Sequence, residues 1–413
     1  MLFAVMLVAA AGNTAMQSLM PSIGRVLEVP DLWIAGAFSL SAVIWVMIAP
    51  HWAHMADRRG RRALMRLGLY GFIASMLVCG LVLAAGLAGW LAPATVFVIF
   101  VIGRCFYGAY GSAAPPAVQA YVAARTDGEQ RTVALAAIAS SFGLGTIIGP
   151  ALAPLFIVRP FGLSGPLLAF AAIGLAVLAT LVLRLPDDRP RNPAQGQIVG
   201  EPSIGGANSG AALTRPERAR HALGWRDPRV LNWHIAGIAG GHGHAALLGT
   251  IGFLVIDRLG LPPDAAQSSI ALVLMAGAGA TLLAQWGLIP RLGLDPRALV
   301  LWGSWLAAAG AVITGLSEGV YGITTGFALA SLGFGFFRPG FTSGASLAVS
   351  AEEQNAVAGM VTSVNGVAFV AAPTIGVALY GLWMPLPFLL AGALMVALAG
   401  WISLHLPPSG CAA

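Results

Sequence analysis

Four ionisable side chains lie well inside long apolar runs of this sequence, away from the run ends: Arg104, Arg338, His242 and His244. A charge inside hydrocarbon is costly, and such residues usually mark a substrate or ion pathway. A guanidinium can bind a carboxylate through two parallel hydrogen bonds, and histidine titrates near neutral pH. We therefore expect the two arginines to bind an anionic or zwitterionic molecule and a histidine to carry a proton.

The two histidines stand two residues apart in the segment GGHGHAALLG. On a helix they would diverge by about 200°, so they cannot both face one cavity squarely. Alignment of the two halves of the chain matches His242 to Asn13, a polar position, so we expect His242 to be the proton carrier. A buried histidine that only packs is the alternative. Further candidates for the substrate cavity are Gln17, Ser39, Tyr107, Phe337 and Asn365.

The composition points to a bilayer as the surrounding solvent. Of 413 residues, 58% are hydrophobic and only 9% are charged, against about a quarter charged in soluble proteins. Twelve apolar runs are long enough to span a membrane as helices. They are residues 2–24, 32–54, 64–86, 94–120, 133–157, 164–185, 230–256, 264–289, 298–316, 320–347, 356–381 and 385–406.

The arginines set the orientation of these helices, because the sequence contains no lysine. With the N-terminus inside, 17 of the 22 arginines are cytoplasmic, and only Arg25, Arg159 and Arg258 lie outside. The positive-inside rule then predicts that both termini are cytoplasmic.

The chain divides into similar halves. Residues 186–228 have linker composition and separate residues 1–185 from 229–413, with six runs on each side. SSFGLGTIIGP in the first half is echoed by SVNGVAFVAAP in the second. Such repeats are typical of transporters whose substrate site lies between the halves. The sequence thus predicts an all-α membrane protein of twelve transmembrane helices in two six-helix bundles.

Three motifs make the expectation specific. The stretch AHMADRRGRR resembles the loop signature of the major facilitator superfamily, with Ala53 in place of its leading glycine. GRCFYGAYGSAA resembles the signature of the family's fourth helix, with Arg104, Gly108 and Gly111 on its positions. The antiporter signature of the fifth helix is matched by Gly143, Gly145, Gly149 and Pro150. We expect its glycines to let a neighbouring helix approach closely.

The group most similar in these motifs is the drug:proton antiporters, including tetracycline exporters. Many members carry an acid in the first helix, where this chain has Ala9. The resemblance implies that Arg104 serves proton coupling and that the fifth-helix glycines seal the cavity. It also implies that the loop latches the two halves against the helix that begins near Gln354. The latch residues are Asp57, Arg58, Gly60, Arg61 and Arg62. We also expect Gly60 to permit a tight turn between the second and third spans.

We therefore expect proton-coupled efflux of a small organic molecule, such as a drug, an organic acid or a siderophore, from a monomer in the cell's inner membrane. A proton-coupled importer of a small anionic metabolite is the alternative. The energy source would be the proton gradient, with no cofactor and no metal, although His51 and His54 lie one helical turn apart. We expect neither enzymatic activity nor nucleic-acid binding, because the sequence has no catalytic constellation, and its arginines flank apolar runs rather than forming a basic stripe.

Replacing Asp57 by Asn should leave the protein inserted but nearly inactive, because the amide keeps the shape of the side chain and loses the charge that a helix N-terminus favours. Insertion is measured by membrane fractionation and transport in proteoliposomes. Normal transport by the variant would refute the latch.

Overall fold

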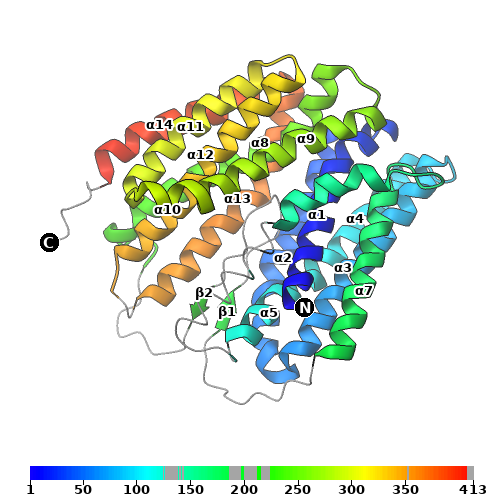
Figure 1. Cartoon of the computed structure of the whole chain (residues 1–413), viewed down its shortest axis with the longest axis horizontal. Helices are drawn as coiled ribbons and strands as arrows, with labels where there is room; N and C mark the ends of the chain where they lie inside the picture. Colours follow the sequence, from blue (N-terminus) through cyan, green and yellow to red (C-terminus); the bar gives the residue numbers. More distant parts are fainter. Residues whose placement is uncertain are drawn as a thin grey trace. The chain divides into compact units, whose positions relative to one another are not determined.

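The computed structural model describes residues 1–123, 125, 138, 141, 144–185, 197–199, 212–214, 224–350 and 353–406 (Figure 1). The chain folds into two compact units. The first comprises Met1–Pro216 and Pro263–Ala271, and the second comprises Glu217–Pro262 and Leu272–Ala413.

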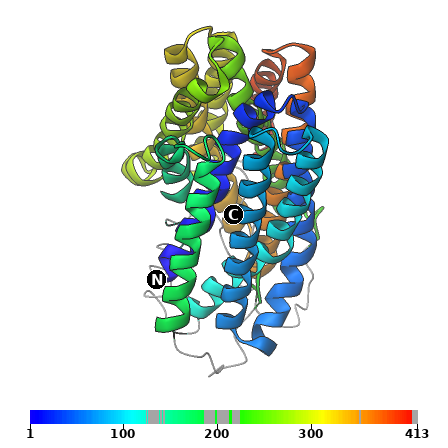
Figure 2. The ribbon, with the colours of Figure 1, turned by 90° about the vertical axis from the view of Figure 1, so that its right-hand side faces the viewer.

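The first unit is built from helices. They are α1 (Leu2–Val26), α2 (Asp31–Arg59), α3 (Arg61–Leu87), α4 (Pro93–Tyr110), the 3₁₀ turn η1 (Gly111–Ala113), α5 (Ala114–Ala123), helical residues 144–152, η2 (Ala153–Phe156) and α7 (Gly165–Arg184). Helices α3 and α7 lie side by side (Figure 2). Phe72 of α3 and Phe170 of α7 are both buried in the core of this unit.

The second unit is also helical. Its elements are α8 (Pro228–Leu259), most of α9 (Pro263–Leu282), the π-helical η3 (Leu283–Leu288), α10 (Ile289–Leu292), α11 (Pro296–Leu316), α12 (Val320–Leu347), α13 (Gln354–Leu382) and α14 (Leu386–His405). Helices α11 and α12 meet at small residues: a Cβ atom at Gly303 would come within 2.7 Å of the Gly333 carbonyl oxygen. Close backbone approach of this kind is how helices pack in lipid.

Eleven helices in the described part of the chain are long and apolar enough to cross a membrane. They match eleven of the twelve predicted runs. The run predicted at 133–157 is described only in part, and its apolar helix there covers Leu144–Phe156. The run predicted at 94–120 is interrupted, because the turn η1 separates α4 from α5. The two-bundle arrangement and the orientation of the termini stay predictions.

The predicted linker contains a feature that its composition did not reveal. Strand β1 (Gln197–Val199) pairs antiparallel with β2 (Ala212–Thr214), with Ile198 opposite Leu213. The composition of 186–228 is dominated by turn-forming and charged residues, which obscures two strands of three residues each.

The connection between α2 and α3 is a single residue, Gly60. Both helices run further than the hydrophobic pattern predicted, so that the charged stretch 57–62 lies mainly on helical turns rather than in a loop. Gly60 has φ +83° and ψ 143°, a conformation that is open essentially only to glycine. The tight turn predicted at this glycine is confirmed.

Replacing Gly60 by Ala should lower the midpoint of thermal unfolding of the purified protein, because a residue forced into such a backbone region costs about 1–3 kcal/mol. Gly36 is the matched control: it lies inside α2 with nothing within 4 Å of an added Cβ atom. Gly36→Ala should leave the midpoint unchanged or raise it, since alanine is the better helix former. Equal effects of the two substitutions would contradict the turn argument.

Candidate functional site

Arg104 is completely buried within the first unit. It lies on α4, and α1 and α2 supply the groups nearest its guanidinium. The carbon Cζ lies 4.7 Å from the ring centre of Phe38 and 5.0 Å from that of Tyr107. Nη1 donates to the sulfur of Met16 over 3.6 Å. The charge is therefore held by π electrons and a thioether, both of which are weak partners.

Two of the guanidinium nitrogens, Nε and Nη2, are buried without a hydrogen-bond partner among the described residues. The ionisable groups that act on Arg104 there are Cys79, Cys105 and Tyr107, and none is a carboxylic acid. An unmet buried donor costs about 1–3 kcal/mol, and two desolvated cation–π contacts return about 2 kcal/mol each. The rings can offset the cost of burying the charge. They do not accept hydrogen bonds from the N–H groups at Nε and Nη2, which lie in the plane of the guanidinium.

The backbone fixes this arginine in place. Ser41 of α2 donates its hydroxyl to the Arg104 carbonyl oxygen over 3.0 Å. One turn on, a Cβ atom at Gly108 would lie 2.5 Å from the Ser41 carbonyl oxygen. Because α4 lies this close to α2, Phe38 reaches the guanidinium.

Two other predicted substrate residues stand close in the sequence to Arg104 or to its partner Met16. Tyr107 is buried, with ring centres 5.3 Å from Trp45 and 6.2 Å from Phe72. Gln17 follows Met16 on α1 and is half-buried. The structure thus brings Tyr107 together with Arg104, as predicted, and leaves the role of Gln17 a prediction.

In the second unit, aromatic side chains that the sequence did not single out enclose His244. Its ring stacks on Phe334 of α12, with centres 4.6 Å apart and planes at 23°, and meets Phe369 of α13 edge-on at 6.3 Å. Arg338 lies one helical turn beyond Phe334 and acts electrostatically on His244. His242 instead places Nδ1 2.7 Å from the Ile238 carbonyl oxygen of its own helix.

The sequence favoured His242 and gave no sign of this aromatic enclosure, since the rings come from distant helices. Of the other candidates, Phe337 is buried on α12, whereas Asn365 on α13 and Ser39 on α2 are half-buried.

The fifth-helix glycines press against α1. A Cβ atom at Gly145 would lie 2.7 Å from Ala10 Cβ and 2.8 Å from the Leu7 carbonyl oxygen. At Gly149 it would overlap the Ala11 carbonyl oxygen and the Thr14 hydroxyl. The close approach expected of these glycines is confirmed, and their sealing role stays a prediction. Pro150 is buried in the same helix, and Gly143 lies outside the described residues.

The predicted latch is described only in part. The side chains of Asp57, Arg58 and Gln354 lie outside the description, as does that of His54 of the histidine pair. Arg61 is buried, and Nη2 of Arg62 donates to the Val182 carbonyl oxygen over 2.6 Å, which ties α3 to α7. Among the described residues, no group of three or more metal-ligating side chains comes together.

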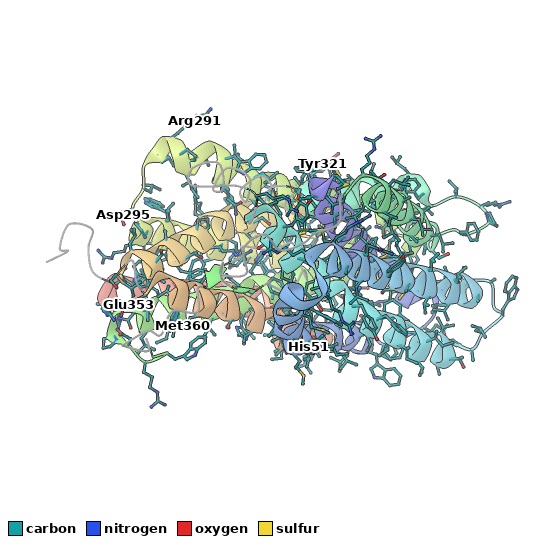
Figure 3. The ribbon with its side chains drawn as sticks, turned by 90° about the horizontal axis from the view of Figure 1, so that it is seen from below. His51, Arg291, Asp295, Tyr321, Glu353 and Met360 are labelled. Atoms are coloured by element: carbon teal, nitrogen blue, oxygen red, sulfur yellow. The ribbon has the colours of Figure 1, made fainter. Side chains whose placement is uncertain are left out.

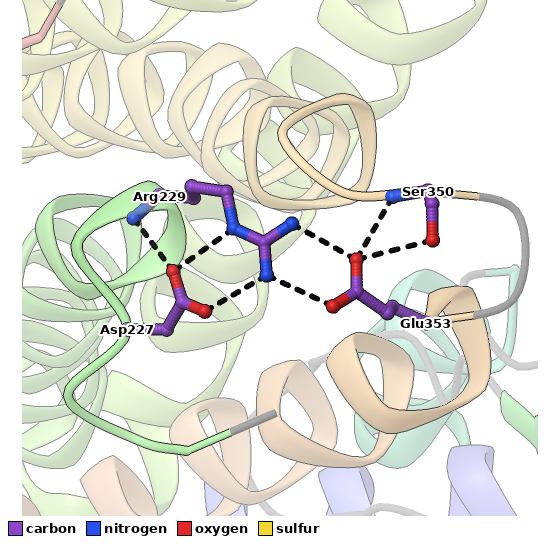
Figure 4. A network of polar contacts seen from close by, with 4 residues as sticks. All are labelled: Asp227, Arg229, Ser350 and Glu353. Atoms are coloured by element: carbon purple, nitrogen blue, oxygen red, sulfur yellow. Dashed lines mark hydrogen bonds and ion pairs between the residues drawn. The ribbon is translucent and has the colours of Figure 1, made fainter. Parts of the chain in front are cut away.

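A charge cluster that the sequence analysis missed lies at the start of α8 (Figure 4). Arg229 donates from Nε and Nη2 to the two carboxylate oxygens of Asp227, at 3.1 and 2.8 Å. It also donates from Nη1 and Nη2 to Glu353, at 3.0 and 2.8 Å. Glu353 in turn accepts from the backbone N–H and hydroxyl of Ser350, each at 3.1 Å. This network ties α8 to the connection between α12 and α13.

Glu353 lies at the same end of the second unit as Asp295, which caps the N-terminus of α11 by accepting from the Ala298 N–H (Figure 3). The hydrogen bonds from Arg229 lower the pKa of the Glu353 carboxyl from 4.5 to about 2. The signal in the sequence was only an acid just before α13, 124 residues away from its partner.

The sequence of this chain is similar to those of known membrane transporters. Residues 2–294 match the sequence model of the Major Facilitator Superfamily. A stretch of 169 residues is 30% identical to Multidrug resistance protein 2 of Bacillus subtilis (strain 168). That match spans 40% of this chain and 38% of the relative.

Solved structures share the fold at low identity. A bacterial homolog of the human lysosomal transporter Spinster, in an inward-facing and occupied conformation, is 12% identical with a TM-score of 0.73. The match covers 98% of this chain and 95% of that one. The human organic anion transporter MFSD10 (TETRAN) is 18% identical with a TM-score of 0.62, over 97% of each chain.

The Arg229–Glu353 contact predicts a pH dependence. Because the folded-state pKa of Glu353 is depressed, its stabilisation is fully present above pH 4.5 and is lost as pH falls towards 2. Glu353→Gln should therefore lower the thermal unfolding midpoint at pH 6, and the difference from the wild type should shrink by pH 3. Glu318→Gln is the control, since this exposed acid lies 4.0 Å from Arg258. A difference for Glu353→Gln that does not change with pH would contradict the ion-pair account.

Proposed function

Because the chain belongs to the Major Facilitator Superfamily, and is thus a multi-pass membrane transporter rather than an enzyme, we propose that it exports a small organic molecule in exchange for protons. The exported molecule would be a drug, an organic acid or a siderophore. Alternating access would carry the substrate, with the proton gradient as the energy source and no cofactor. The protein would act as a monomer in the cell's inner membrane, in contact with lipid and without nucleic acid.

The observation that carries the direction is the glycine contact between residues 144–152 and α1. Gly145 and Gly149 leave no room for a side chain against α1, and they fall where the chain resembles the antiporter signature. Such tight packing suits an exchanger, since a leak at this place would dissipate the gradient that drives export. The similarity to Multidrug resistance protein 2 over 169 residues supports the same direction.

For the proton carrier, we favour His244 over His242. The ring of His244 lies between aromatic side chains and under the influence of Arg338. Protonation of His244 then depends on whatever charge binds near Arg338, and that dependence is what coupling requires. The Nδ1 atom of His242 lies instead 2.7 Å from a carbonyl oxygen of its own helix.

A proton-coupled importer of a small anionic metabolite is the alternative function. The feature that favours it is the electrostatic effect of Arg338 on His244. An anion held there would lessen the repulsion between two positive charges and so favour protonation of the histidine. Substrate and proton would then bind cooperatively and travel in the same direction.

The test is proteoliposome counterflow of a mixed pool of drugs and organic acids, with and without a pH gradient. Export predicts that an imposed gradient drives substrate uphill against the proton flow. His244→Gln should abolish this coupling and leave downhill exchange intact, whereas His242→Gln should transport normally. Uphill movement in the direction of the proton flow would instead establish the importer, and insensitivity to the gradient would reject both.

A further inference from the structure

We propose that Arg104 binds the carboxylate of the substrate side-on, through Nε and Nη2, so that the transported molecule is a small apolar or aromatic monocarboxylate. This inference rests on the proposed function in one respect, namely that the chain transports a small organic molecule. It does not depend on the direction of transport or on the proton carrier.

The two unpaired nitrogens of Arg104 are arranged to bind a carboxylate. Nε and Nη2 lie on one edge of a guanidinium, where their two N–H groups are parallel and match the two oxygens of a carboxylate. Both nitrogens of Arg104 are buried and unpaired among the described residues. Two orphan donors on the same edge define a ligand with two acceptor oxygens rather than a single one.

Another arginine of the same chain shows how this edge of a guanidinium binds a carboxylate. Arg229 holds Asp227 by this same pair of nitrogens, at 3.1 and 2.8 Å. Asp227 therefore shows which partner this edge takes when the fold supplies one. For Arg104 the ionisable neighbours are two thiols and a phenol, so a carboxylate has to come from outside the described fold.

The surroundings of the guanidinium indicate what the rest of the ligand is. The groups around the guanidinium are the rings of Phe38 and Tyr107 and the thioether of Met16. These surfaces favour apolar and aromatic bodies. A single arginine balances a single negative charge, so a monocarboxylate fits better than a dicarboxylate or a cation.

Arg104 has no exposed surface in this conformation, so the side chains that cover it have to move before a ligand can enter. Met16 is the natural one to yield, since its side chain is flexible and its sulfur is a weak acceptor. The rings can stay in contact with the guanidinium, because they meet its π surface while the carboxylate takes its edge.

The experiment measures equilibrium binding of radio-iodinated 4-iodobenzoate to the purified full chain, with 4-iodobenzamide as a competitor of the same shape and no charge. We expect the carboxylate to bind and the amide to compete poorly. Arg104→Gln and Arg104→Lys should each raise the Kd about tenfold or more, since lysine keeps the charge but cannot present two parallel donors. Arg25→Gln, which removes an exposed arginine paired with Asp31, should leave the Kd unchanged.

Three results would overturn the inference: equal affinity for acid and amide, unchanged binding by Arg104→Gln, or no binding of the acid by the wild type. The comparison of acid with amide uses the wild type, so it decides even if an Arg104 variant does not fold. Binding without gradient-driven export would leave this inference standing and remove the proposed direction. Gradient-driven export of a lipophilic cation, with no binding of the acid, would support the proposed direction and overturn this inference.

Discussion

Lipid supplies no hydrogen bonds, so every polar group inside the hydrocarbon region has to be satisfied by the protein or by what the protein binds. Helices meet this demand for the backbone, and serines and threonines such as Thr14, Ser304 and Thr314 bond to carbonyl oxygens of their own helices. Arg104 is an exception in the described structure; the Trp45 indole and the His234 ring also lack hydrogen-bond partners there, but of these three side chains only Arg104 carries a fixed charge. Its cost is tolerable only if the site has a use for it, and binding a charged substrate is such a use.

The two buried or half-buried arginines that the sequence singled out have different surroundings. Arg104 in the first unit is enclosed by rings and a thioether and is rigidly placed by the contact between α4 and α2. Arg338 in the second unit acts electrostatically on a histidine enclosed by two phenylalanines. The first arrangement suits a fixed anchor for an anion. The second suits a proton site whose occupancy responds to nearby charge. Under the proposed function, Arg104 would hold the anion and His244 would carry the proton.

The sequence revealed the helices well, because a run of apolar residues of membrane length rarely occurs outside a transmembrane helix. It also indicated Gly60 as a turn and Gly145 and Gly149 as close contacts, since glycine at such places has a direct geometric meaning. It could not reveal the enclosure of His244, the rings over Arg104 or the Arg229–Glu353 pair. Each of these depends on which faces of distant helices meet, and periodicity within one helix carries no such information. The helical extension of α2 to Arg59 was hidden for another reason: charged residues end an apolar run without ending a helix.

The central claim, that the Arg104 guanidinium obtains its partner from the substrate, is tested most directly by a crystal structure of the full chain with 4-iodobenzoate. The anomalous signal of iodine locates the ligand independently of its shape in the density. The account predicts one iodine site in the first unit, with both carboxylate oxygens within hydrogen-bonding distance of Nε and Nη2 of Arg104. An iodine site elsewhere, with Arg104 still bonded only to Met16, would contradict it.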